Sequence, residues 1–166
     1  AGAEYGPAKR WPMERFAEVA TKLSEHWPQI EWALFGAPSE KAMGEKLSSL
    51  MPAARHRNLV GATTLTGLIE ELRSCRLLVT NDTGTMHLAA ALGVPTVSIF
   101  GSTEPVLTGP VGNHHRVVRH HVPCSPCFKR ECPFGHYDCL TGVTVERVVA
   151  EVAQELQRKV EILVPA

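Results

Sequence analysis

The sequence predicts one α/β domain built on a doubly wound parallel sheet. Segments with helically spaced apolar residues alternate with short apolar runs along the chain. Most of the short runs are continuously apolar, as strands buried on both faces of a parallel sheet are. The length of 166 residues fits a single hydrophobic core.

The elements follow one another in a regular order. Pro12 suits the first position of a helix, Ser39 suits an N-cap, and Gly93 suits the end of a short helix. Amphipathic or small-residue patterns predict helices over 12–27, 39–50, 64–75, 83–93 and 144–160. Apolar runs predict strands over 30–36, 58–61, 76–81, 95–101 and 116–122. The segment 123–142 is rich in Cys and Pro, so we expect an irregular loop.

The chain opens on a loop, AGAEYG, followed directly by a helix. A parallel sheet normally supplies a strand before such a loop, so we expect the first strand to be missing. Ligands of doubly wound sheets bind beyond the carboxyl ends of the strands. The loops expected to carry function are therefore residues 36–40, 61–65, 81–87 and 101–105.

Composition excludes several classes of protein. Lys plus Arg equals Asp plus Glu, at 17 each, so no net charge favours binding to nucleic acid. No apolar run approaches the roughly 20 residues of a membrane span. The first residues lack the basic-then-apolar layout of a signal peptide, so we expect a cytoplasmic protein.

One run, VTNDTGTMHLAAALGVPTVSIFGSTEP, carries the most information about function. Asp82, Thr83 and Gly84 close a predicted strand and open a helix, whose unpaired amides suit a phosphate. Gly84 lets a ligand approach the backbone closely, while Thr83 and Thr85 add hydroxyl donors. His87 lies one turn further, within reach of a diphosphate or a sugar hydroxyl.

Other interpretations of this run remain. Asp82 is equally consistent with a simple N-cap, and His87 with a helix-surface residue. An Asp-Thr-Gly triplet also occurs in aspartic proteases, but those need a β loop where this chain has the helix-forming run MHLAAAL. A dinucleotide oxidoreductase is disfavoured because no G-x-G-x-x-G follows a strand.

The pattern D-T-G-x-x-H-x-x-A-A-L-G-x-P followed by F-G-S-T-x-P resembles the C-terminal domain of glycosyltransferase family 9, the lipopolysaccharide heptosyltransferases. The opening GAEYGPAKRWP and the stretch CSPCFKRECPFGHYDCL are similar to the heptosyltransferase II branch. The resemblance implies the GT-B architecture, in which two Rossmann-like domains face each other across a cleft. Residues 1–166 would form the C-terminal, nucleotide-sugar-binding domain, and the N-terminal acceptor domain would be absent.

The resemblance also implies roles for individual residues. The family's contacts with the diphosphate and the sugar fall on Asp82, Thr83 and Gly84, and its motif histidine falls on His87. The lysine of the family's Lys-x-Trp-Pro element falls on Lys9, where an ammonium group would stabilise the leaving diphosphate. Lys9 is otherwise an ordinary solvated residue before a helix.

Adenosine contacts in the family come from the loops after the second and third strands. These contacts fall here on Ser39 and Glu40, and on Thr63 with Thr64. A carboxylate such as Glu40 would hydrogen-bond a ribose hydroxyl. Each of these residues also fits plain turn or N-cap chemistry.

The implied reaction is inverting transfer of heptose from ADP-L-glycero-D-manno-heptose to the lipopolysaccharide inner core. The acceptor and the general base would belong to the missing N-terminal domain, so this chain alone should bind the donor without turnover. No cofactor is required for such transfer, and no nucleic acid is expected as a partner. The full enzyme would work near the inner face of the inner membrane of a Gram-negative bacterium, with peripheral membrane contact.

A second cluster, Cys124-x2-Cys127-x4-Cys132-x6-Cys139, encloses a histidine. This spacing suits zinc or an iron–sulfur cluster, because thiolates bind both. The alternative, which we favour, is a set of reduced thiols that pack the loop. Two functions of other classes therefore stay open, namely a standalone nucleotide-binding module and a metal-dependent interaction module without transferase activity.

Overall fold

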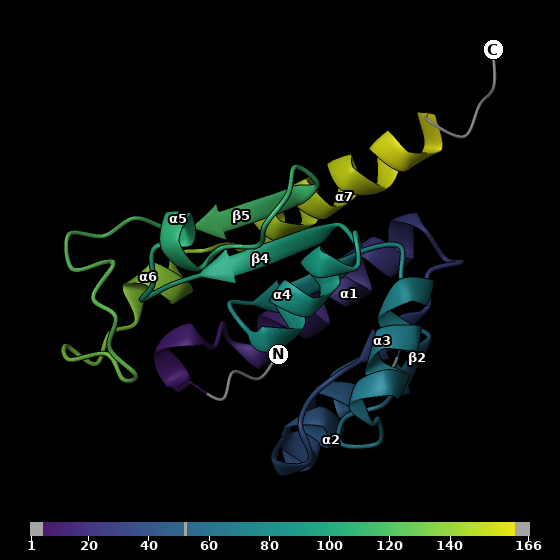
Figure 1. The fold of residues 1–166 in the computed structure, drawn as a ribbon, viewed down its shortest axis with the longest axis horizontal. Coiled ribbons are helices and arrows are strands. Elements are labelled where there is room, and N and C mark those ends of the chain that lie inside the picture. Colours follow the sequence, from purple (N-terminus) through teal and green to yellow (C-terminus); the bar gives the residue numbers. More distant parts are fainter. Residues whose placement is uncertain (1–4, 52, 162–166) are drawn as a thin grey trace.

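The computed structural model describes residues 5–51 and 53–161, with side chains up to residue 158. Helices and strands alternate as predicted (Figure 1). The strands are β1 (Trp32–Leu34), β2 (His56–Asn58), β3 (Leu78–Asn81), β4 (Thr96–Phe100) and β5 (His115–Arg119). The α-helices are α1 (Met13–His26), α2 (Lys41–Ser49), α3 (Leu65–Ser74), α4 (Gly84–Ala91), α5 (Pro105–Thr108), α6 (Asp138–Thr141) and α7 (Val145–Glu161). Two short 3₁₀ helices are η1 (Pro7–Lys9) and η2 (Pro38–Glu40).

All pairings between described strands are parallel, which confirms the predicted α/β class. The strands form two sheets, β1-β2 and β3-β4-β5, where we expected one. A cavity of about 810 Å³ is lined by residues of β1 and β3, together with flanking helices and loops. The strand expected before the opening loop would lie outside the described residues.

Helices cover both faces of the larger sheet. One core joins α1 and α7 to apolar side chains of β4 and β5, including Val97, Ile99 and Val118. A second core joins α3 and α4 through Leu72 and Ala89. Figure 1 shows β4 and β5 side by side, with their carboxyl ends pointing toward the loop that follows β5. Within the described part of the chain, no helix is long and apolar enough to cross a membrane.

Helix boundaries differ from the predictions at several points. Pro12 is the N-cap of α1 and not its first residue. The helix predicted over 39–50 is divided into η2 and α2, and Ser39 lies exposed within η2 instead of capping. The reason is that the Glu40 carboxylate turns back to accept the amide of Ala37 at 2.8 Å. The predicted loop 123–142 contains the short helix α6 at its end.

Candidate functional site

The candidate site lies where β3 and β4 end. The segment before α1 crosses these strand ends and brings Lys9 to them. The amide of Ser102, just beyond β4, donates to the carbonyl of Ala8 at 3.3 Å. The amide of Trp11 donates to Oδ1 of Asn81, the last residue of β3, at 3.1 Å. The Trp11 indole is 1% exposed and donates to the carbonyl of Val143 at 3.0 Å. This anchoring fixes the position of the intervening Lys9.

Lys9 and Asp82 form an ion pair at the centre of the site. The Lys9 ammonium lies 2.6 Å from Oδ2 of Asp82, and their side chains are only 12% and 4% exposed. The same oxygen accepts hydrogen bonds from the hydroxyls of Thr103 at 2.7 Å and Thr108 at 3.3 Å. Asp82 therefore holds Lys9 in place. One interpretation of the sequence made Asp82 the N-cap of the helix, but Thr83 is the cap.

The first turn of α4 presents unpaired backbone amides. Its cap is Thr83, whose hydroxyl accepts the amide of Met86 at 3.4 Å. Among the described residues, the amides of Gly84 and Thr85 have no hydrogen-bond acceptor. Gly84 is exposed, and nothing lies within 4 Å of where its Cβ would be. Together these features form the anion-binding geometry of a helix N-terminus.

The large cavity links this turn to the loop after β1. Thr83, Gly84 and Thr85 line it, as do Gly36 and Glu40. The structure thus brings together, around one cavity, predicted residues from two loops that are far apart in the sequence.

Four of the other predicted residues are not among the described residues that line the cavity. His87 and Ser39 are exposed, and neither is among the described residues lining the cavity. The hydroxyl of Thr64 accepts the amide of Gly67 at 3.1 Å, so Thr64 caps α3, and Thr63 precedes it half-buried.

Sequence reasoning missed the two hydroxyls that bind Asp82. Thr103 belongs to the F-G-S-T-x-P pattern, so the signal for one of them was present in the motif. Thr108 ends the four-residue helix α5, which carried no signal of its own. Both missed residues fix the carboxylate that holds Lys9.

The four clustered cysteines line one small cavity. A small cavity of about 10 Å³ is lined by Cys124, Cys127, Cys132 and Cys139, together with His136. Yet no three His, Cys, Asp or Glu side chains in residues 5–51 and 53–161 are arranged so that they could hold a metal ion. The geometry therefore gives no support to the zinc or iron–sulfur interpretation.

Two thiols of this cluster, those of Cys132 and Cys139, differ in acidity. Hydrogen bonds from backbone amides, led by that of Tyr137, lower the pKa of the Cys132 thiol. Burial, reinforced by the neighbouring thiols, raises the pKa of Cys139. Cys132 is thus better suited than Cys139 to exist as a thiolate.

The family model of glycosyltransferase family 9 (heptosyltransferase) matches residues 1–138. The chain belongs to glycosyltransferase family 9. Lipopolysaccharide heptosyltransferase 2 of Escherichia coli is 34% identical to this family 9 chain over 154 residues. That alignment covers 91% of this chain and 44% of the relative.

Solved structures agree with this family assignment. The E. coli ADP-heptose lps heptosyltransferase II superposes with a TM-score of 0.79 at 32% identity, covering 95% of this chain and 45% of that one. A family 9 glycosyl transferase from Veillonella parvula gives the same TM-score at 29% identity, covering 95% and 44%. This family 9 chain therefore spans about half the length of the relatives it matches, and it has the fold of one half of a GT-B transferase.

Proposed function

We propose that this chain binds ADP-L-glycero-D-manno-heptose as the donor half of an inverting heptosyltransferase that extends the lipopolysaccharide inner core. The observation that carries the proposal is the Lys9 ammonium, held by Asp82 beside the unpaired amides of Gly84 and Thr85. The E. coli relative is named for ADP-heptose, and its whole length is about twice that of this chain.

The diphosphate is assigned to the first turn of α4. The amides of Gly84 and Thr85 point partial positive charge at an anion, and the missing side chain of Gly84 leaves room for it. Lys9 adds an ammonium donor, and the hydroxyls of Thr83 and Thr85 add further donors. Asp82 serves this site indirectly, because its carboxylate is occupied by Lys9 and two threonine hydroxyls.

The nucleoside is assigned to the loop after β1. Glu40 lies in this loop and carries a carboxylate suited to ribose hydroxyls, although one of its oxygens already binds the Ala37 amide. Ser39, Thr63 and Thr64 remain proposed contacts of the nucleoside, and His87 remains a proposed contact of the sugar.

The proposed reaction forms a bond between an acceptor hydroxyl oxygen and the anomeric carbon of the heptose, with inversion. The bond from that carbon to the diphosphate oxygen breaks, and negative charge develops on the departing ADP. Lys9 and the α4 amides stabilise that charge in place, which lowers the barrier. The acceptor proton goes to a general base that we assign to the other domain of the enzyme, together with the lipopolysaccharide acceptor and any membrane contact. We place this reaction in the cytoplasm, at the inner membrane of a Gram-negative bacterium.

Calorimetry with ADP-heptose and with ADP tests the donor site. Lys9→Ala should weaken binding by about 1–3 kcal/mol, the value of a charge-assisted hydrogen-bonding site. Asp82→Ala should weaken binding by a similar amount, about 1–3 kcal/mol, because Lys9 loses the carboxylate that positions it. Lys46→Ala is the matched control, because Lys46 is an exposed lysine that pairs with Glu14 and is not among the described residues lining the cavity. Unchanged affinity in both site variants would remove these residues from the donor site.

A coupled ADP-release assay with donor and acceptor tests the division of labour between domains. We expect residues 1–166 to bind the donor and give no turnover. Turnover at the level of a full-length relative would refute the assignment of the base to another domain.

A further inference from the structure

The loop that follows β5 is fastened to the segment that carries Lys9. The amide of Ala8 donates to the carbonyl of Arg130 at 3.0 Å, and the hydroxyl of Tyr5 donates to the carbonyl of Phe128 at 2.7 Å. The amide of Phe128 in turn donates to the carbonyl of Ser102 at 2.7 Å, just beyond β4. The loop is therefore joined both to the Lys9 segment and to the strand ends.

Gly6 shows how close this contact is. Its φ of 149° lies in a region that side chains rarely adopt, and a Cβ at this position would approach the Arg130 carbonyl to 2.5 Å. Only glycine lets the two backbones meet here. The position of Arg130 relative to Lys9 is thus fixed by the backbone as well as by side chains.

Two cations lie against one aromatic ring in this region. The Lys9 ammonium is 4.6 Å from the centre of the Tyr5 ring, and the Arg130 guanidinium carbon is 5.3 Å from the same centre. Lys9 is neutralised by Asp82, whereas no described carboxylate forms an ion pair with Arg130. The side chains of Lys9, Arg130 and Asp82 together therefore carry a net positive charge.

We propose that Arg130 is a second cation of the donor site and binds the diphosphate of the nucleotide sugar, with Tyr5 as its positioning residue. The exposed guanidinium offers a planar set of donors that matches phosphate oxygens. The Tyr5 ring restricts the guanidinium by cation–π contact, which lowers the entropy that Arg130 loses on binding. This inference rests on the proposed function, because it concerns the same ligand.

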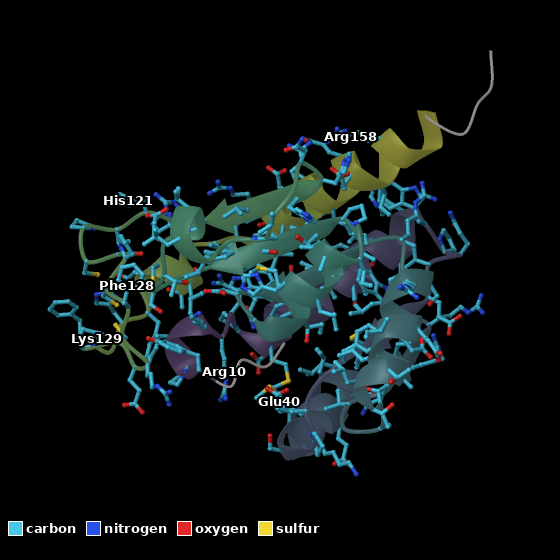
Figure 2. All side chains as sticks on the ribbon, viewed as in Figure 1. Arg10, Glu40, His121, Phe128, Lys129 and Arg158 are labelled. Carbon is cyan, nitrogen blue, oxygen red and sulfur yellow. The ribbon has the colours of Figure 1, made fainter. Side chains whose placement is uncertain are left out.

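The experiment compares ligands that differ only in their phosphates. Affinities of the purified protein for ADP, AMP and adenosine are measured for the unchanged protein and for Arg130→Gln. We expect Arg130→Gln to weaken ADP binding by on the order of ten-fold or more and to leave adenosine binding unchanged. Lys129→Gln is the matched control, because it removes an exposed charge from the neighbouring loop position (Figure 2) and should have no effect.

Each outcome decides between the inference and its alternatives. Equal losses for ADP and adenosine would mean that Arg130 only maintains the loop, and unchanged ADP affinity would mean that it does not touch the ligand; either result overturns the inference. If Lys9→Ala weakens ADP binding while Arg130→Gln does not, the donor site stands and only Arg130 is excluded. If the unchanged protein fails to bind ADP, the proposed function falls together with this inference. Tyr5→Leu should reproduce the selective loss for ADP with Arg130 still present.

Discussion

Replacing Asp82 with Asn tests how much the central ion pair contributes to the fold. The substitution keeps the shape of the side chain and its amide oxygen can still accept the Thr103 hydroxyl. It removes the negative charge that lies 2.6 Å from the Lys9 ammonium. Lys9 is then left with a charge in a position that is 12% exposed and without its partner.

The size of the effect follows from this burial. Removing one partner of a fully buried ion pair costs about 3–5 kcal/mol, because the other charge stays uncompensated. Lys9 retains some exposure and can turn toward water, so we expect a loss of about 2–3 kcal/mol in the free energy of unfolding. For a chain of this length that corresponds to a fall in Tm of roughly 4–12 °C.

Urea unfolding followed by tryptophan fluorescence measures this loss, since Trp11 is buried beside the pair. The control is Glu14→Gln, which breaks the exposed pair with Lys46 and should cost about 1 kcal/mol or less. Lys9→Met completes a double-mutant cycle, in which Asp82→Asn should cost less once Lys9 is gone. A loss within about 0.5 kcal/mol of zero, or equal losses with and without Lys9, would refute the reasoning.

Three further predictions concern binding and reactivity. Gly84→Ala places a methyl group in open space, so Tm should stay the same or rise slightly while calorimetry shows weaker ADP binding; unchanged affinity would contradict the assignment of the diphosphate to this turn. In alkylation followed by mass spectrometry, Cys132 should react at lower pH than Cys139. The lowered pKa of Cys132 leaves more thiolate as pH falls, whereas the raised pKa of Cys139 leaves less. The reverse order would show that the loop amides do not control the acidity of Cys132. Gly6→Ala should lower both Tm and ADP affinity, since its Cβ collides with the Arg130 carbonyl; a variant that matches the unchanged protein in both would show that the loop contact is dispensable.

The alternation of helices and strands was predictable because burial on both faces leaves a plain apolar signal. The ends of the strands were less predictable from the sequence. The run 30–36 is apolar except for Glu31, but only Trp32–Leu34 pairs, while Ile30 and Phe35 pack into the cores outside the ladder. The second strand was misplaced because His56–Asn58 is a polar, largely exposed strand whose position is set by pairing with β1.

The candidate site also has one part that the sequence could predict and one part that it could not. The strand-to-helix turn at Asp82 and Gly84 could be predicted, because helix-start chemistry is local in the sequence. The partner of Asp82 could not, since nothing in the residues around Lys9 indicates that its ammonium will meet a carboxylate from the end of β3. The contact of Tyr5 with Arg130 is equally distant in the chain, and only the folded backbone brings the two together.

The backbone hydrogen bonds of Ala8 have a consequence for how the loop after β5 can vary. The Ala8 amide donates to the carbonyl of Arg130 and the Ala8 carbonyl accepts the amide of Ser102, so the residue next to Lys9 is held by this loop and by the end of β4. An insertion or deletion in the loop would shift Lys9 through main-chain atoms alone, whatever side chains it carried. The length of the segment between β5 and α6 is therefore constrained by an ammonium group near the other end of the chain.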